Sequence, residues 1–219
     1  MAALAGVAVP LWFFGATLVF GALRDGYDPL VDAISELGQE GGRNALAWNV
    51  LGFGGTALLH ALFAAAAWRS LASDAKGRWV AGLLAFAALA LAASGAFRCD
   101  PGCPELPGSL LGMLHNVAGL AYFATMTVLP LVAGRLFAAR PEWAPLARAT
   151  LYAGAALVAL FLAGPVLGPA RVGAWQRAFL LLSHAWLAAL SVRLYVLLPA
   201  ARARHAVQAY VREGHPVEA

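Results

Sequence analysis

Charged residues are scarce in this sequence. Only 12% of its 219 residues are charged, 62% are apolar, and the mean hydropathy is +0.73. A water-soluble domain typically has about 25% charged residues. The shortage therefore excludes an ordinary soluble protein and indicates that most of the molecular surface faces hydrocarbon.

Long runs without charge accompany that shortage. Six of them have roughly the 20 residues that a helix needs to cross the hydrocarbon core of a bilayer. Because lipid offers no partner for backbone polar groups, these runs are predicted to be helices. We expect an all-α integral membrane bundle of six transmembrane helices over residues 1–199, followed by a basic tail over residues 200–219. The predicted spans are residues 5–23, 46–68, 79–97, 110–134, 149–168 and 174–198.

The first apolar run lacks the basic start of a secretory signal peptide and is longer than the apolar core of one. It also contains Pro10 and Trp12. We expect it to be retained as the first transmembrane helix.

Basic residues are divided unequally between the two sets of connections. Nine lie after spans 2 and 4 and in the tail, against five after spans 1, 3 and 5 and at the start of span 6. The positive-inside bias then predicts a bacterial inner-membrane protein with both termini in the cytoplasm. The tail is expected to contact anionic headgroups. Scattered basic residues exclude a nucleic-acid partner, and no pattern indicates an oligomeric state.

Most acidic residues fall in the connections after spans 1 and 3. Both connections are odd-numbered, so they must lie at the same membrane face, which is the predicted outer one. In the first connection, Asp32, Ser35 and Glu36 share one side of an amphipathic stretch. We expect a short interfacial helix there, and we expect any functional site at this face.

Only two cysteines are present, Cys99 and Cys103, four residues apart across a Pro-Gly turn in the second of these connections. An oxidising compartment favours a disulfide between them. Free or redox-active thiols and a thiolate metal site are alternatives, although no complete zinc signature accompanies them.

Three histidines fall inside predicted spans. His115, beside Asn116, lies near the outer end of span 4, and His184 lies about half-way through span 6. Polar side chains at such positions usually face the bundle interior or a wet cavity, so each is either a structural hydrogen-bonding residue or part of a site. His60 is expected too far towards the cytoplasm to join them. Because the three depths differ, no pair suits haem, which is disfavoured.

Two catalytic or metal-binding arrangements are compatible with these residues. Ser35, His115 and Asp100 have the residue types of a nucleophile, a base and an orienting acid. Alternatively, an oxygen-rich group could hold a divalent metal. That group comprises Asp28, Asp32, Glu36 and Asp100 with His115.

Two of the charged residues have plainer interpretations as well. Asp100 could cap a turn or a helix. Arg177 could extend to the headgroups, pair with a carboxylate or clamp a lipid phosphate. We expect an outer pocket that either modifies a membrane lipid or only binds, transports or senses an amphipathic molecule. Its expected residues are Asp28, Asp32, Ser35, Glu36, Asp100, His115, Asn116, Arg177 and His184.

Four blocks together resemble a known family, namely Tyr27-Asp28-Pro29, Ile34-Ser35-Glu36-Leu37-Gly38, Cys99-Asp100-Pro101-Gly102-Cys103 and His115-Asn116. It is the bacterial and archaeal membrane family catalogued as domain of unknown function 998. The resemblance implies the six-span layout but no settled activity. That family often has Gly-x-x-Glu-Arg before its last span, and Gln176 replaces the Glu here. A remoter likeness to the Frag/DRAM/Sfk group implies membrane lipids as partners.

Overall fold

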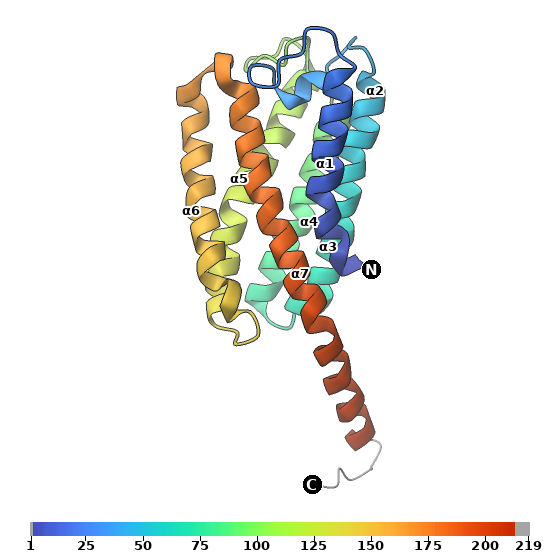
Figure 1. The fold of residues 1–219 in the computed structure, drawn as a ribbon, viewed down its shortest axis with the longest axis vertical. Coiled ribbons are helices and arrows are strands. Elements are labelled where there is room, and N and C mark those ends of the chain that lie inside the picture. Colours follow the sequence, from blue (N-terminus) through green and yellow to red (C-terminus); the bar gives the residue numbers. More distant parts are fainter. Residues whose placement is uncertain (1, 213–219) are drawn as a thin grey trace.

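The computed structural model describes the backbone of residues 2–212 and the side chains of residues 2–168 and 170–197. Within residues 2–212 the chain is all-α and has no strand. Six of its helices are long and apolar enough to cross a membrane, which confirms the predicted fold class (Figure 1).

The second span is built from three consecutive helices, and the other spans are simpler. The first span is the 3₁₀ helix η1 (Ala2–Leu4) with α1 (Ala5–Ala22). The second joins α2 (Ala45–Trp48), the π-helix η3 (Asn49–Gly54) and α3 (Gly55–Leu71). The remaining spans are α4 (Ala75–Ala96), α5 (Leu110–Ala138), α6 (Ala144–Leu167) and α7 (Val172–Arg212). Two short 3₁₀ helices, η2 (Ile34–Gly38) and η4 (Pro169–Arg171), lie in the connections.

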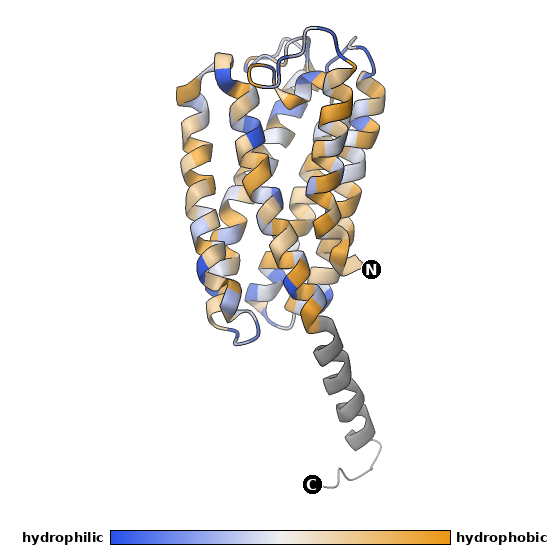
Figure 2. Cartoon of the chain, in the orientation of Figure 1, coloured by the Kyte–Doolittle hydropathy of each residue, from blue (hydrophilic) through white to orange (hydrophobic). Residues whose placement is uncertain are grey.

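Apolar side chains dominate the middle of the bundle, whereas hydrophilic residues concentrate in the connections (Figure 2). The six candidate spans are 21 to 29 residues long, enough to cross about 30 Å of hydrocarbon at 1.5 Å per residue. Polar caps mark two of their starts. Asp74 accepts a hydrogen bond from Gly77 N at 2.8 Å, and Ser109 accepts one from Gly112 N at 2.9 Å.

The connections gather at two ends of the bundle. We call the end formed by residues 23–44, 97–109 and 168–171 the disulfide end, and the end formed by residues 72–74 and 139–143 the opposite end (Figure 1). The two acidic connections thus lie together, as their odd numbering predicts. Backbone and side-chain hydrogen bonds join them, from Glu40 N to Cys99 O at 2.9 Å and from Gly102 N to Gln39 Oε1 at 2.8 Å.

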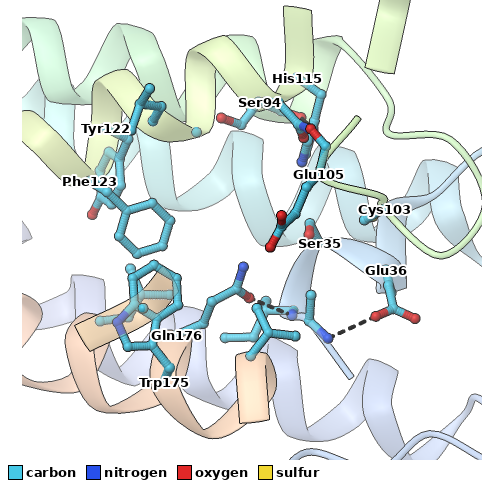
Figure 3. A pocket seen from close by; sticks show the side chains of 18 of the residues that line it. Ser35, Glu36, Ser94, Cys103, Glu105, His115, Tyr122, Phe123, Trp175 and Gln176 are labelled. Carbon is cyan, nitrogen blue, oxygen red and sulfur yellow. Dashed lines mark hydrogen bonds between the residues drawn. The ribbon is translucent and has the colours of Figure 1, made fainter. Parts of the chain in front are cut away.

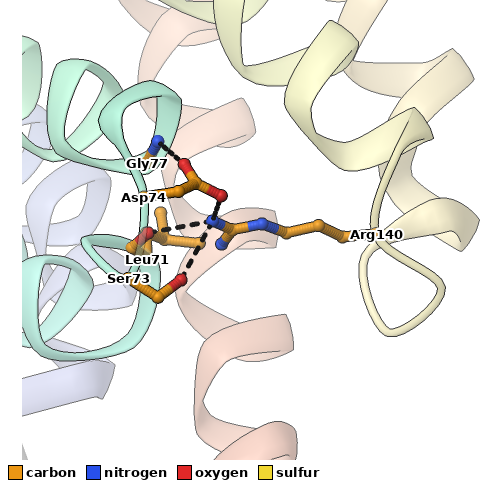
Figure 4. Close-up of polar contacts among 5 residues, drawn as sticks. All are labelled: Leu71, Ser73, Asp74, Gly77 and Arg140. Carbon is orange, nitrogen blue, oxygen red and sulfur yellow. Dashed lines mark hydrogen bonds and ion pairs between the residues drawn. The ribbon is translucent and has the colours of Figure 1, made fainter.

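A single arginine ties the two connections of the opposite end. The Arg140 guanidinium contacts Asp74 Oδ2 at 2.7 Å, Leu71 O at 3.1 Å and Ser73 Oγ at 3.3 Å (Figure 4). The hydrogen bond from Gly77 N and the contact with Arg140 lower the pKa of Asp74. This contact fixes the α5–α6 connection against the end of α3.

Two glycines bring α5 and α6 together near the opposite end. A Cβ on Gly134 would lie 2.7 Å from the Leu151 side chain, and one on Gly154 would lie 2.6 Å from that of Leu131. Only small residues allow so close an approach between membrane helices. After Leu157, however, no residue of α6 is buried. Phe161, Gly164 and Pro165 in this part of α6 line the cavity described below.

Several predicted boundaries differ from the observed ones. The second span extends to Leu71 and the fifth begins at Ala144, because both helices continue into the polar ends. The expected interfacial helix is a five-residue 3₁₀ helix, η2, whose Ile34 and Leu37 are buried against the bundle. The predicted contact of the basic tail with headgroups concerns side chains outside the described residues.

Candidate functional site

A cavity of about 720 Å³ opens at the disulfide end. Its walls come from α1, η3, α4, α5, α6 and α7, and its rim comes from η2 and the loop that follows the disulfide (Figure 3). Apolar and aromatic side chains form most of the wall, including Phe13, Phe53, Leu91, Leu120, Tyr122, Phe123, Phe161, Trp175 and Leu180. The polar lining residues are Asp32, Ser35, Glu36, Ser94, Glu105, His115, Asn116 and Gln176. Concave, mostly apolar sites with a few polar groups are typical of ligand-binding pockets.

Trp175 connects two walls of the cavity. Its Nε1 donates to Leu160 O at 2.5 Å, and its ring stacks on Phe123 with centroids 5.1 Å apart. Gly164 of α6 lies against the same indole, where a Cβ would come within 2.7 Å of the ring. The indole thus links α6 to α7 and presents an aromatic surface to the cavity.

The η2 segment carries Ser35 and Glu36 to the rim. The start of η2 is fixed because Glu36 Oε1 accepts from Ala33 N at 2.9 Å and Gln176 Oε1 accepts from Ile34 N at 2.8 Å. Burial raises the pKa of Glu36, although the hydrogen bond from Ala33 N opposes that rise. Gln176, which stands where the resembled family often has Glu, therefore ties η2 to α7.

Arg177 braces the same segment from behind. Its guanidinium donates to Tyr27 Oη at 2.6 Å, to Gly173 O at 3.0 Å and to Asp32 O at 3.2 Å. Arg177 does not line the cavity, and the ion pairs of the described residues do not include it. Of the alternatives for Arg177, pairing with a carboxylate is not seen, because backbone carbonyls and a phenol oxygen occupy the guanidinium. Burial raises the pKa of Tyr27, and the charge of Arg177 opposes that rise.

Asp100 orders the loop that leads into α5. Its carboxylate accepts hydrogen bonds from Gly108 N at 2.8 Å, from Ser109 N at 3.0 Å and from the Ser109 hydroxyl. These bonds, that of the Ser109 hydroxyl above all, lower the pKa of Asp100. Asp100 thus positions Ser109, which is the N-cap of α5. The neighbouring Cys99 and Cys103 form the predicted disulfide, and Cys103 lines the cavity.

His115 is placed by two backbone carbonyls. It is only 6% exposed, and its Nδ1 lies 2.8 Å from both Ser94 O and Phe97 O. Carbonyl oxygens only accept, so Nδ1 must carry the proton of the neutral ring. Nε2 is then the nitrogen with the free lone pair. It has no partner among the described residues and is not fully enclosed, since His115 lines the cavity.

The expected nucleophile–base–acid arrangement is not assembled. Ser35 and His115 line the same cavity, but Asp100 is occupied at the start of α5 and does not contact the imidazole. Asn116 Nδ2 donates to Pro104 O at 3.0 Å and to Glu105 O at 3.3 Å, so it holds the loop that carries Glu105. Figure 3 shows the Glu105 carboxylate pointing into the cavity.

The expected metal ligands do not converge either. Asp28 Oδ1 accepts from Leu30 N and Asp32 Oδ2 accepts from Asp28 N, each at 2.8 Å, so these carboxylates organise their own turn. Within the described part of the chain, no three His, Cys, Asp or Glu residues are grouped as metal ligands.

His184 belongs to a second polar cluster, deep in the bundle. Its Nε2 lies 2.9 Å from Tyr122 Oη, and its ring centroid lies 5.6 Å from that of His60. The expectation that His60 lies too deep to join the other histidines is therefore wrong for this pair. His60 is residue 16 of a 27-residue span, so it sits near mid-membrane. Both nitrogens of His60 and Nδ1 of His184 lack a partner among the described residues.

Sequence reasoning missed part of the lining. Glu105, Tyr122 and Trp175 were not expected at the site, yet all three line the cavity. One signal was available, because Gly119 and Tyr122 follow His115 at i+4 and i+7 and so share its helix face. No comparable signal marks Glu105, whose position depends on the bond from Asn116.

The bundle and its cavity define a multi-pass membrane protein with a ligand-sized pocket at one end. The family model described as "Protein of unknown function (DUF998)" matches residues 7–193, and the chain belongs to this family. Comparison with curated proteins and with solved structures found no match.

Proposed function

We propose that the cavity binds an amphipathic molecule taken from the membrane. The observation that carries this proposal is the division of one 720 Å³ cavity into an aromatic wall at membrane depth and a polar rim at the disulfide end. An apolar chain would occupy the wall, and a polar head would meet the rim. This site matches the mixed chemistry of a lipid or lipid-like ligand.

The route of entry is proposed to lie between α5 and α6. Leu120 lines the cavity and is 60% exposed, and Pro165 of α6, which also lines it, is exposed as well. After Leu157 the residues of α6 are half-buried or exposed. A ligand could therefore enter sideways from the lipid without crossing the polar rim.

A catalytic role is the second candidate, and His115 favours it. Two carbonyls fix its tautomer, which leaves Nε2 free to accept a proton from a bound molecule. In the enzyme version of the proposal, His115→Ala abolishes conversion of extracted membrane lipids, followed by mass spectrometry, while the protein still folds and inserts. Equal conversion by His115→Ala would exclude His115 from the chemistry.

The membrane side is part of the proposal too. The distribution of basic residues supports a bacterial inner-membrane protein with both termini in the cytoplasm. The Cys99–Cys103 disulfide supports an oxidising compartment for the disulfide end.

Filling the cavity tests the binding function. Gly119 lines the cavity, and a Cβ built on it meets no atom within 4 Å, so Gly119→Leu should fill space without a backbone clash. Gly15 is the matched control, because it is also helical and open but exposed on α1. Dodecylamine, dodecanol and dodecanoate are the probes, added to protein reconstituted in phosphatidylcholine nanodiscs.

At least one probe should raise the thermal unfolding temperature of the wild type and of Gly15→Leu, but not of Gly119→Leu. Stabilisation by none of the probes would contradict the proposed function. Equal stabilisation of all three proteins would locate binding outside the cavity and contradict it as well.

A further inference from the structure

The charges at the cavity rim have one sign. Asp32, Glu36 and Glu105 line the cavity, and among the lining residues that the structure describes there is no lysine or arginine. Anionic headgroups are usually recognised by arginine or lysine. The rim therefore offers no cationic side chain to a phosphate or a carboxylate, and its side-chain donors include only neutral groups such as the Ser35 hydroxyl and the Gln176 amide.

The rim carboxylates are not neutralised by ion pairs. The pairs among the described side chains are Arg43–Asp25 at 3.6 Å and Arg140–Asp74 at 2.7 Å, and neither includes a lining residue. Arg24 and Arg177 are the nearest guanidinium groups behind η2, but they bind backbone carbonyls, namely those of Glu36 and Asp32. The negative charge facing the cavity is thus left for a ligand.

The hydrogen-bonding groups at the rim that lack a partner are mainly acceptors. The His115 side chain is buried apart from its access to the cavity, and the ring nitrogen without a partner, Nε2, accepts because Nδ1 holds the proton. The Glu105 carboxylate has no hydrogen-bond partner among the described residues and points inward (Figure 3). A protonated amine supplies up to three donors and a positive charge, which complements this set.

We infer that the cavity selects a cationic amphiphile, an apolar chain that carries a protonated amine and no phosphate. This inference rests on the proposed binding function. The ammonium sits between Glu105 and His115, with Glu36 beside it, and the chain runs along Phe123 and Trp175. Recognition of this kind combines ion pairing at the rim with aromatic contact below it.

The three probes named above share one chain and differ in the charge of the head. They therefore distinguish binding of amphiphiles in general from selection of a cationic head. Dodecylamine should stabilise the wild type more than dodecanol, and dodecanoate should stabilise it least. Glu105→Gln should weaken dodecylamine binding by roughly two- to fivefold, the effect of one partly exposed ion pair, and leave dodecanol binding unchanged. Glu36→Gln, which keeps an oxygen for Ala33 N, should act in the same direction.

Asp25→Asn is the matched control for charge. It removes the same charge from the disulfide end, but Asp25 pairs with Arg43 and does not line the cavity. Dodecylamine binding to Asp25→Asn should equal that of the wild type. If it falls as much as in Glu105→Gln, general surface potential explains the preference and the inference is wrong. If all three probes bind the wild type equally, the cavity binds amphiphiles without the inferred head selectivity. If none binds, the proposed function itself fails.

Discussion

Replacing His60 with leucine should stabilise the protein. His60 is 1% exposed, and neither ring nitrogen has a hydrogen-bond partner among the described residues. A buried polar group without a partner destabilises a fold by about 1–3 kcal/mol, whereas an apolar group of similar size avoids that penalty. His60→Leu should therefore raise the free energy of unfolding by about 1–3 kcal/mol, or roughly 2–4 °C in melting temperature for each kcal/mol.

Substitution of the neighbouring Tyr122 should instead lower the free energy of unfolding. Tyr122 Oη lies 2.9 Å from His184 Nε2, so Tyr122→Phe leaves that nitrogen without its partner. We expect a loss of about 1 kcal/mol, and much of it should return when His184→Leu is added. Both effects are measured by thermal unfolding in one detergent, followed by intrinsic fluorescence.

The decisive result is the sign of the change in the free energy of unfolding that His60→Leu causes. A clear loss of stability would mean that water or another partner satisfies the His60 nitrogens in the folded protein, which would refute the reasoning. Recovery of stability in the Tyr122→Phe/His184→Leu variant tests the contact between Tyr122 and His184 separately, because that contact does not involve His60.

Three further predictions concern other parts of the molecule. Gly154→Val should lower the free energy of unfolding by about 1–3 kcal/mol through overpacking against Leu131, whereas Gly82→Ala, where a Cβ meets no atom within 4 Å, should be neutral or slightly stabilising in the same melts. Because the pKa of Asp100 is lowered by folding, its contribution to stability is present above its ordinary value of 3.8 and is lost as the pH falls through the lower, folded value; melting temperatures measured against pH should lose this component in Asp100→Asn. After reduction in intact cells, Cys103, which lines the cavity, should react with a membrane-impermeant maleimide, whereas Cys99 is buried; labelling only after lysis would reverse the proposed orientation.

The features that sequence predicted correctly depend on few assumptions. Six apolar runs set the number of crossings, and that number alone brings the odd connections to one end. The pairing of Cys99 with Cys103 needs only a local turn. The composition and the odd or even number of each connection therefore predict the bundle and the place of its polar end. Neither depends on how a helix is rotated or tilted.

The cavity and the histidine pair depend on details that composition does not contain. His60 lies within two residues of the midpoint of the second span and His184 lies at the midpoint of the last span, so the two rings reach the same depth. The close approach of α6 to α5 is at Gly134 and Gly154, whereas the part of α6 beyond Leu157 lines the cavity. Such geometry arises from packing between helices, so a residue pattern within one helix does not reveal it.

Most polar residues that sequence singled out at the disulfide end have structural partners. Asp100 positions the N-cap residue of α5, Arg177 braces η2, and Asn116 holds the Glu105 loop. Each of these hydrogen bonds uses a donor or an acceptor that a ligand would otherwise need. A polar residue type at the right face is therefore a weak guide to function, whereas an atom left without a partner at a cavity is a stronger one. By this criterion the His115 Nε2 and the Glu105 carboxylate are the groups through which any ligand head would be recognised.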